Sequence, residues 1–538
     1  MARQLPLLLA LICVLVGPIL LRPKGEGILL AGERTVVIIT PNNESIRSEY
    51  GRAFEDWYRA KHGQRVHVDW RIPGGTSEIG RYIDAEFIAS FQNYWLGALH
   101  RPWSKLVESS FSNRKVTLGP DPAKDTPEQQ ARRAFLDSQI GSKLDLFFGG
   151  GAYDSQQAAG KGFLVDCGFL KEHPEMFGDG PGQIPKVVSG EPYWDPQGRW
   201  IGTVISSFGI CYNPETLQRL GIAQPPKRWA DLTSPQYFHA IALANPTQSG
   251  SVNKTFEMVI QQQIQERLGG RKVTPEEEQA AVREGWVAGM RLLMKIGANA
   301  RYFTDSSTKI ALDVAAGEAA AGMTIDFYGR FQNEAVRQPD GSSRLQYVNA
   351  EGGTSFGVDP IGLFRGAPNR EVAKEFIAFL MSPEGQKLWN WKVGTPGGPK
   401  HYALRRLPIL PAMYAPKYRE FRSDPDVDPY AQAREFVYHD QWTAALFRQI
   451  AFIFRVMCID SHEELQHAWE ALQVAQFPPE ATRAFEDVSV VDYAAATGRI
   501  RESLGGPDRI HEVQLAKELA DHFRAQYIRV AELARAGR

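Results

Sequence analysis

The sequence has few cysteines and no excess of charge of either sign, and each absence excludes a class of protein. Four of its 538 residues are cysteine and none belongs to a CxxC pair, which leaves zinc-ribbon and thioredoxin-type sites without support. The 61 basic and 62 acidic side chains nearly cancel, so nucleic acid and anionic membranes are not expected partners. Hydrophobic residues make up 43% and charged residues 23% of the chain, which is typical of a soluble globular protein and excludes disorder.

One long uncharged apolar run is present, and it lies near the N-terminus. Residues 5–21 follow Arg3 and precede Arg22 and Lys24, which is the layout of a secretory signal. We therefore predict a signal peptide within residues 1–31 and a periplasmic or extracellular location. No clear cleavage site follows the run, so an uncleaved anchor that tethers the protein to a membrane through this run stays open.

Export would bring the chain into a compartment where disulfides form. Three cysteines follow the predicted signal, so at most one internal disulfide is available, and Cys167–Cys211 is one candidate.

Alternating strand and helix patterns predict an α/β fold. Residues 34–40 form a β-branched apolar run, and a polar turn then leads into an apolar helical stripe that includes Ile46 and Trp57. Further strand patterns precede helical ones along the chain, at residues 64–70, 144–151, 201–211, 241–247 and 320–328. Such repeats build parallel sheets whose ligand crevice lies at the carboxyl ends of the strands. We expect two α/β lobes.

The pattern changes near residue 400, where proline becomes frequent and the remainder reads as helical. Residues 442–459 are rich in apolar side chains, but Arg448 and Arg455 favour a buried helix over a membrane span. We interpret residues 401–538 as a helical extension packed on the lobes.

One motif suggests an enzyme. Gly353–Gly357 reads GTSFG, which matches a nucleophile elbow with Ser355 as the nucleophile. The elbow requires a helix after the serine, whereas Asp359 and Pro360 begin a pattern that favours a strand. A serine hydrolase at Ser355 is therefore the least favoured alternative.

Four polar loops follow predicted strands: Asn42-Asn43, Thr76-Ser77-Glu78, the glycine triplet Gly149–Gly151, and Ser249-Gly250-Ser251. Several of them open helices, and a helix N-terminus offers free N–H groups and partial positive charge to an anion. A single serine there is most often only a cap. Four such loops together predict a binding cleft that contains no nucleophile–base pair.

Five segments carry a family resemblance, and they lie at or near these loops. In chain order they are GGTSEIGRYI, DLFFGGGAYDSQQAAGKGFL, ANPTQSGSVNKTF, AAGEAAAGMTIDFYGRF and GAPNREVAKEFIAFLMSPEGQ. Together they resemble the extracellular solute-binding proteins of ABC importers, and more narrowly the type 2 periplasmic binding proteins of the ferric-iron, thiamine and polyamine group. The resemblance covers residues 33 to about 400.

The resemblance implies two lobes that close over a ligand, joined by crossover strands near residues 201–210 and 345–357. It implies no enzymatic activity, no cofactor, and a membrane permease as partner. A membrane-anchored sensor or scaffold that uses the same cleft is the alternative. The expected organisation is lobe 1 over 32–205 with a helical insertion at about 91–140, lobe 2 over 206–345, a return to lobe 1 over 346–400, and the extension over 401–538.

Three ligand classes stay open under this resemblance. Ferric-iron members carry two adjacent tyrosines where this chain has Asp326-Phe327-Tyr328, so iron would rely on Glu78, Asp326 and Tyr328. Members that bind organic phosphates or phosphonates use serine-rich helix starts, and a cationic amine would need carboxylates and aromatic rings. The ligand-binding residues predicted for all three classes are Asn42, Asn43, Thr76, Ser77, Glu78, Gly150, Gly151, Ser249, Gly250, Ser251, Asp326 and Tyr328.

Overall fold

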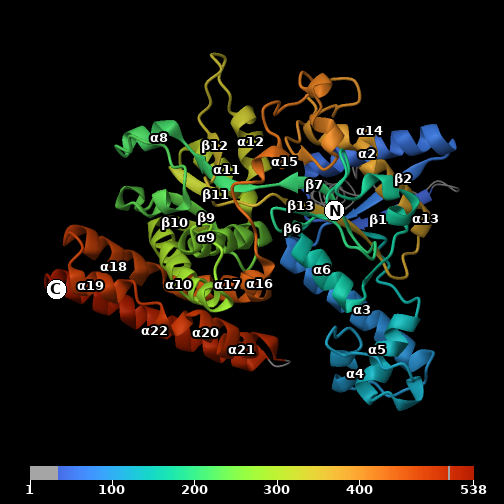
Figure 1. The fold of residues 1–538 in the computed structure, drawn as a ribbon, viewed down its shortest axis with the longest axis horizontal. Helices are drawn as coiled ribbons and strands as arrows, with labels where there is room; N and C mark the ends of the chain where they lie inside the picture. The colour runs from blue at the N-terminus through green and yellow to red at the C-terminus, as the bar shows by residue number, and fades with distance from the viewer. Residues whose placement is uncertain (1–33, 507–508) are drawn as a thin grey trace, which may run out of the picture.

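Two β-sheets, each covered by helices, organise the molecule (Figure 1). The computed structural model describes residues 34–506 and 509–538, so the predicted signal or anchor at residues 1–31 lies outside the described residues. We call the first sheet with its helices the first lobe, and the second sheet with its helices the second lobe.

The first sheet has the strand order β14-β7-β13-β3-β1-β2, and β4 pairs with β13 beside this path. Its strands are β1 Arg34–Ile39, β2 Val66–Arg71, β3 Leu146–Phe148, β4 Leu164–Val165, β7 Ile201–Ser206, β13 Gly357–Phe364 and β14 Leu407–Pro408. β1, β2 and β3 are parallel, as their apolar runs predict, whereas β13 is antiparallel to both β3 and β7. A separate hairpin consists of β5 Val187–Val188 and β6 Glu191–Pro192.

The second sheet has the order β10-β9-β11-β8-β12. Its strands are β8 Phe208–Tyr212, β9 Ile241–Ala244, β10 Ala300–Thr304, β11 Ala321–Ile325 and β12 Gln346–Asn349. β9 is parallel to β10 and β11, while β8 is antiparallel to β11 and β12. The parallel part places the ends of β9, β10 and β11 at one edge.

The chain passes twice between the two sheets before the extension. β7 ends at Ser206 and β8 begins at Phe208, so Ser207 alone makes the first passage. Residues 350–356 make the second, between β12 and β13. Both lie in the ranges that the family resemblance implied. The Ser207 hydroxyl donates to Asn349 Oδ1 at 2.9 Å, which joins the two passages.

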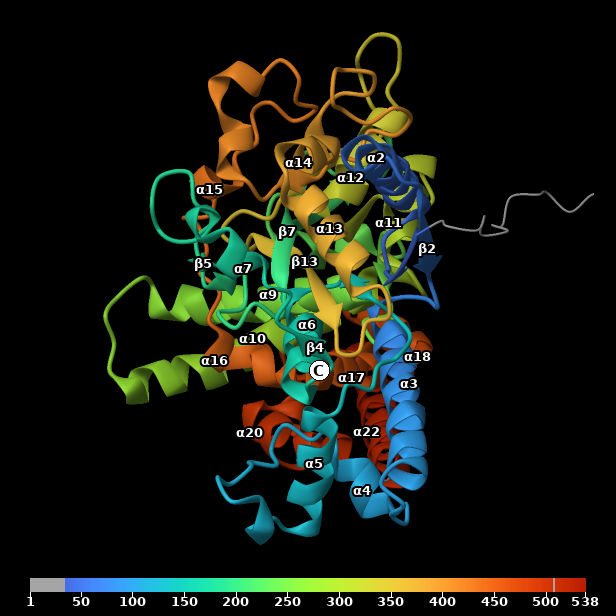
Figure 2. The ribbon, with the colours of Figure 1, turned by 90° about the vertical axis from the view of Figure 1, so that its right-hand side faces the viewer.

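Helices of the first lobe cover its sheet and also extend away from it. They are α2 Glu44–His62, α3 Thr76–Gly97, α4 Lys105–Ser110, α5 Pro127–Asp137, α6 Ala152–Lys161, α7 Phe169–Glu172, α13 Arg370–Met381 and α14 Pro383–Asn390. α3 continues past the start of the predicted insertion at residue 91 and carries α4 and α5 at its far end (Figure 2). There the Phe91 ring lies 4.7 Å from Phe111 and 5.7 Å from Phe135, so α3, α4 and α5 share an aromatic core.

Helices of the second lobe lie on both sides of its sheet. They are α8 Pro214–Arg219, α9 Gly250–Leu268, α10 Pro275–Asn299, α11 Ser307–Ala316 and α12 Asp326–Ala335. The N-cap of α10 is a capping box, in which the Thr274 side chain and the Glu277 side chain each accept from the other's backbone N–H.

The chain beyond residue 400 contacts both lobes. β14 pairs with β7 of the first sheet, so this sheet continues into the predicted extension. The later helices are α15 Pro429–Gln432, α16 Asp440–Thr443, α17 Phe447–Phe454, α18 His462–Val474, α19 Pro479–Phe485, α20 Tyr493–Ala495, α21 Arg501–Gly505 and α22 Arg509–Arg535. Most of them pack against α9 and α10 of the second lobe, whereas α15 lies near α12 and α14 at the other end of the molecule (Figure 1). Two tryptophan indoles hold this contact: Trp469 donates to Asn299 Oδ1 at 2.8 Å, and Trp286 donates to the Val491 carbonyl at 2.9 Å.

One helical segment of the described chain, Asp440–Ile459, is long and apolar enough to cross a membrane. The share of its apolar window that is buried inside the protein is 67%, which is typical of a core helix and agrees with the prediction of a buried helix.

The candidate disulfide Cys167–Cys211 is wrong. Cys167 follows β4 in the first lobe and Cys211 lies in β8 of the second sheet. Both thiols, and that of Cys458, are free and buried. Burial raises the pKa of Cys167 to about 11 and of Cys211 to about 12, so both stay protonated at neutral pH.

Candidate functional site

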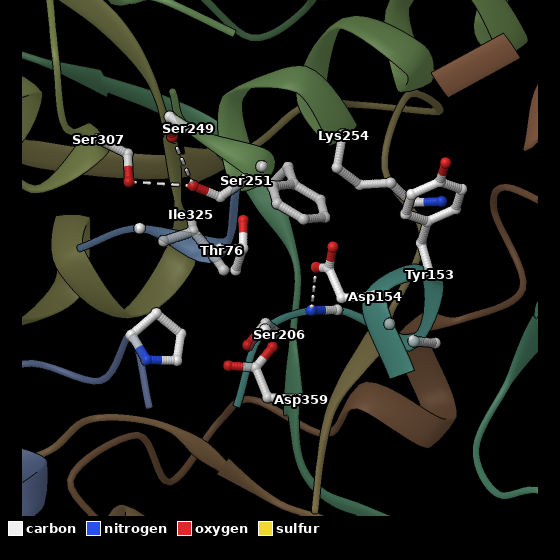
Figure 3. A pocket seen from close by; sticks show the side chains of 18 of the residues that line it. Thr76, Tyr153, Asp154, Ser206, Ser249, Ser251, Lys254, Ser307, Ile325 and Asp359 are labelled. Atoms are coloured by element: carbon white, nitrogen blue, oxygen red, sulfur yellow. Dashed lines mark hydrogen bonds between the residues drawn. The ribbon is translucent and has the colours of Figure 1, made fainter. Parts of the chain in front are cut away.

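A cavity of about 590 Å³ lies between the two lobes and is lined by side chains of both lobes and of the extension. Figure 3 shows its groups in two regions. Ser249, Ser251 and Ser307 gather on one side, and Lys254 with Tyr153 lie on the other. The volume is in the range of about 300–1,000 Å³ that is usual for small-molecule sites.

Four helix N-termini meet at this cavity, those of α3, α6, α9 and α11. α9 and α11 begin with serine caps: Ser249 accepts from the Val252 N–H and Ser306 from the Thr308 N–H. α3 begins at Gly75 without a side-chain cap, so its first N–H groups are available to a ligand. Each N-terminus carries partial positive charge, so together they favour an anion.

Hydroxyl groups of the second lobe form a chain along these N-termini. Ser249 Oγ and Ser251 Oγ lie 3.2 Å apart, and Ser251 donates to Ser307 Oγ at 3.0 Å. Ser249 and Ser251 follow β9, while Ser307 follows β10, so the parallel register of these strands brings the hydroxyls together. Hydroxyls can both donate and accept, which suits them to the oxygens of a phosphate or phosphonate.

The two lobes touch at the cavity rim, so this is a closed arrangement. An added Cβ at Gly75 would lie 2.9 Å from the Gln248 carbonyl oxygen, and one at Gly250 would lie 2.6 Å from Thr76 Oγ1. Gly75 and Thr76 belong to the first lobe, and the other two belong to the second. Glycine at 75 and 250 therefore permits the close approach.

Carboxylates line the part of the cavity that is nearer to the first sheet. Burial raises the pKa of Asp154 to about 6, against the opposing effect of the Gly151 N–H that donates to it at 3.3 Å. Asp359 is bonded to Arg406, and burial still raises the pKa of Asp359.

Lys254 provides the fully charged cation in the cavity lining. Its Nζ lies 3.1 Å from Glu191 Oε1, 2.9 Å from Glu257 Oε2 and 3.5 Å from the centre of the Tyr438 ring. Burial opposes its charge, but Glu191 and Glu257 outweigh burial and raise the pKa of Lys254. The ammonium therefore stays charged at neutral pH, with its two carboxylates as partners.

The structure brings most of the predicted binding residues together. Those that line the cavity are Asn42, Thr76, Glu78, Gly150, Gly151, Ser249, Gly250, Ser251 and Tyr328. Asn43 instead caps α2 by accepting from the Ile46 N–H, and Ser77 lies outside the lining on the first turn of α3. Asp326 also lies outside, because its buried carboxylate is paired with Arg330 at 3.3 Å.

Of the three residues predicted for ferric iron, Asp326 lies outside the cavity lining that Glu78 and Tyr328 share. Glu78 is paired with Arg81 at 2.6 Å, and Asp326 with Arg330. Within residues 34–506 and 509–538, no group of three or more His, Cys, Asp or Glu side chains is arranged to hold a metal ion.

Ser355 is fully buried, and its hydroxyl donates to Glu191 Oε1 at 2.6 Å. β13 follows it, where a nucleophile elbow would have a helix. The structural context that the serine hydrolase alternative needs is therefore not present at this motif.

Several lining residues were not predicted from the sequence: Tyr153, Asp154, Glu191, Lys254, Glu257, Ser306, Ser307, Thr308, Asp359, Tyr438 and Phe447. The run Asp305–Thr308 carried a usable signal, because it combines hydroxyls with a helix start after a strand. Tyr438 and Phe447 carried none, since the extension shows no pattern of binding residues.

Comparison with known proteins found one family model, described as bacterial extracellular solute-binding protein, that matches residues 140–421. An uncharacterized protein of Haemophilus influenzae is 26% identical over 258 residues, which are 47% of this chain and 62% of that protein. The phosphoglycerate transport regulatory protein PgtC of Salmonella typhimurium is 23% identical over 188 residues, which are 35% of this chain and 40% of PgtC. The chain thus spans less than two thirds of the length of either relative.

Solved structures of similar proteins were also found, and two of them are those of AfuA and HitA. The periplasmic binding protein AfuA of Actinobacillus pleuropneumoniae, with fructose-6-phosphate bound, matches with a TM-score of 0.48 at 17% identity over 81% of this chain and 97% of AfuA. Iron-bound HitA of Pseudomonas aeruginosa matches with a TM-score of 0.43 at 15% identity over 78% of this chain and 99% of HitA.

Proposed function

The chain belongs to the bacterial extracellular solute-binding protein family, and we propose that it captures a small organic phosphate or phosphonate between its lobes for a membrane permease of an ABC importer. The protein would act outside the cytoplasm and would release its ligand unchanged.

The convergence of four helix N-termini carries this proposal. Each N-terminus stabilises an anion by roughly 0.3–1 kcal/mol, and by up to about 2 kcal/mol where the site is partly buried. Here α3 comes from the first lobe while α9 and α11 come from the second. An oxyanion held by all three would therefore stabilise the closed arrangement of the lobes relative to an open one.

The other two ligand classes have weaker support. Iron requires several anionic oxygens at one point, whereas Glu78 and Asp326 are each paired with an arginine. A cationic amine would find carboxylates near Lys254, but it would have to lie beside the Lys254 ammonium.

A ligand panel followed by thermal unfolding tests the proposal. The panel contains inorganic phosphate, sulfate, sugar phosphates, phosphonates, ferric citrate, thiamine and polyamines. A ligand at 100 times its Kd adds about 2.7 kcal/mol to the free energy of unfolding, which gives a measurable rise in Tm. We expect the rise with organic phosphates or phosphonates. A rise with ferric citrate or polyamines alone would contradict the proposal.

A matched pair of serine variants connects any rise to the cavity. Ser249 and Ser104 both cap helices, but Ser104 caps α4, whose residues do not line the cavity. Ser249→Ala and Ser104→Ala should each lower the free energy of unfolding by about 0.5–2 kcal/mol without ligand. We expect Ser249→Ala alone to weaken ligand binding as well. Phosphorus NMR of the released ligand checks that it is chemically unchanged.

A sensor is the second candidate function. The name of the relative PgtC describes it as a transport regulatory protein, and a regulator would use the same closure to present a surface to a membrane partner. Deletion of the gene distinguishes the two. Loss of uptake of the ligand by a cell in which the importer is expressed constitutively supports the transport receptor, and loss of ligand-induced expression alone supports the sensor.

A further inference from the structure

We infer that the C-terminal extension forms a second part of the ligand site, in which Tyr438, Phe447, Lys254 and Glu257 hold an uncharged, hydroxyl-rich portion of the ligand. This inference rests on the proposed function, because it assumes that the anionic end of the same ligand lies at the helix N-termini.

Close to the cavity, the backbone of the extension is held against the β5–β6 hairpin. Gly190, with φ +78°, allows the extension backbone to pass directly against the β5–β6 hairpin, because an added Cβ would lie 1.7 Å from the Tyr438 carbonyl oxygen. The Tyr438 N–H donates to the Ser189 carbonyl at 2.7 Å. The β5–β6 hairpin, which packs against β13 of the first lobe, therefore fixes the position of Tyr438.

The second lobe holds the same segment through α9. Gln261 binds the His439 backbone on both sides, donating to its carbonyl at 2.7 Å and accepting from its N–H at 3.0 Å. Asn253 donates to the Phe447 carbonyl at 2.8 Å. Side chains of the extension therefore enter the cavity from a backbone that both lobes fix.

Aromatic rings and charged groups lie side by side in this part of the cavity. The Phe447 ring lies 4.7 Å from the Tyr153 ring, and the Tyr438 ring lies under the Lys254 ammonium. The Tyr438 hydroxyl donates to Glu257 Oε1 at 2.9 Å. Aromatic faces bind the C–H surfaces of a sugar or polyol, and charged groups beside them bind its hydroxyls.

The hydrogen-bonding groups in this part of the cavity favour a ligand that carries hydroxyl groups. Within the described residues, Glu257 Oε1 accepts from Tyr438 and from Thr443, whereas the buried Glu257 Oε2 has only the Lys254 ammonium, at 2.9 Å, beside it. A ligand hydroxyl can accept from Lys254 and donate to a neighbouring carboxylate at once. A ligand ammonium would have to lie beside the Lys254 ammonium, and an apolar chain could not hydrogen-bond to these charged groups.

Calorimetric titration with three probes tests this inference. The probes are inorganic phosphate, which has only the anionic end, glucose 6-phosphate, which adds a hydroxyl-rich portion, and phosphoethanolamine, which adds an ammonium. For the wild-type protein we expect glucose 6-phosphate to bind at least tenfold more tightly than either of the others.

Variants of the extension then test whether its side chains cause the difference in affinity between glucose 6-phosphate and inorganic phosphate. Phe447→Leu and Tyr438→Phe should each weaken glucose 6-phosphate binding by tenfold or more, while inorganic phosphate binding changes by less than twofold. Phe477→Ala, at an exposed aromatic of the same extension outside the cavity lining, should change neither. The Tm of each variant without ligand reports whether it is folded. If Tyr438→Phe fails to fold, Phe447→Leu carries the test.

Each contrary result has a distinct meaning. Equal losses for both probes, or none, would overturn the role of the extension. Tighter binding of phosphoethanolamine than of glucose 6-phosphate would overturn the ligand class. Binding of inorganic phosphate with no gain from the sugar would overturn the inference and leave the proposed function standing. If none of the three probes binds, the organic-phosphate proposal fails and this inference fails with it.

Discussion

Replacement of Gly75 by alanine would place a methyl group where the two lobes touch. The added Cβ would lie 2.9 Å from the backbone carbonyl oxygen of Gln248, whereas close carbon–oxygen contacts begin at about 3.3 Å. The lobes would have to separate by roughly 0.4 Å at this point. Because the obstructing atom belongs to the backbone, a rotamer change cannot relieve the contact.

We expect Gly75→Ala to destabilise the closed form of the protein. Overpacking by one methyl group costs about 1–3 kcal/mol, which corresponds to ligand binding that is about 5- to 150-fold weaker. The backbone of Gly75, with φ −72°, suits alanine. Without ligand, the variant should therefore lose no more than about 1 kcal/mol, from its poorer capping of α3.

The assay is calorimetric titration with whichever phosphate or phosphonate the panel identifies, together with small-angle X-ray scattering of the liganded protein. Gly80→Ala is the matched control, because Gly80 lies on the same helix and has nothing within 4 Å of an added Cβ. It should raise the free energy of unfolding by about 0.5–1 kcal/mol and leave binding unchanged. Wild-type affinity and wild-type compaction in Gly75→Ala would refute the assignment of this contact to the ligand-bound form.

Three further predictions follow from buried groups and from the attachment of the extension. Burial raises the pKa of Asp154 to about 6, above the ordinary value of 3.8, so the buried carboxylate destabilises the protein at pH 8 and not below about pH 4. Asp154→Asn should therefore raise Tm at pH 8 but not at pH 3.5. Equal rises in Tm at both pH values would contradict this reason. The three described cysteines are free and buried, so mass spectrometry after iodoacetamide treatment should show them alkylated only in denaturant. Dithiothreitol should leave Tm unchanged, and a drop in Tm would indicate a disulfide. Gly190→Ala would place a methyl group against the Tyr438 carbonyl oxygen. Limited proteolysis should therefore cut the segment around residue 438 faster than in the wild type. Unchanged digestion would show that the close approach of the Tyr438 backbone to Gly190 is not needed to hold this segment.

The two-lobed α/β architecture with C-terminal helices was predicted correctly, because each strand–helix repeat is visible in local sequence. The position where the chain changes sheets was harder to find. Residues 201–211 read as one apolar strand, yet the chain leaves the first sheet at Ser206 and enters the second at Phe208. Strand periodicity reports which residues are buried and not which sheet buries them.

The candidate site was predictable where helix starts coincide with hydroxyl-rich loops, as at Ser249 and Ser251. It was not predictable where a side chain has meaning only through a distant partner. Lys254 lies on an amphipathic helix, and only the folded chain shows Glu191 and Tyr438 beside it. Asp326 illustrates the opposite error, since Arg330 stands four residues later on the same helix, and this spacing predicts the ion pair that occupies the carboxylate.

Asn42 and Phe447 line the same cavity, with most of the chain between them. During synthesis, the first lobe and much of the second can form their sheets before the residues that complete the cavity exist. Contacts between such distant parts of a chain form late and slowly. A molecule cut short before residue 401 would therefore lack both the edge strand β14 of the first sheet and one wall of its cavity. Ligand binding at this cavity would thus report that the chain has been made and has folded at least as far as Phe447.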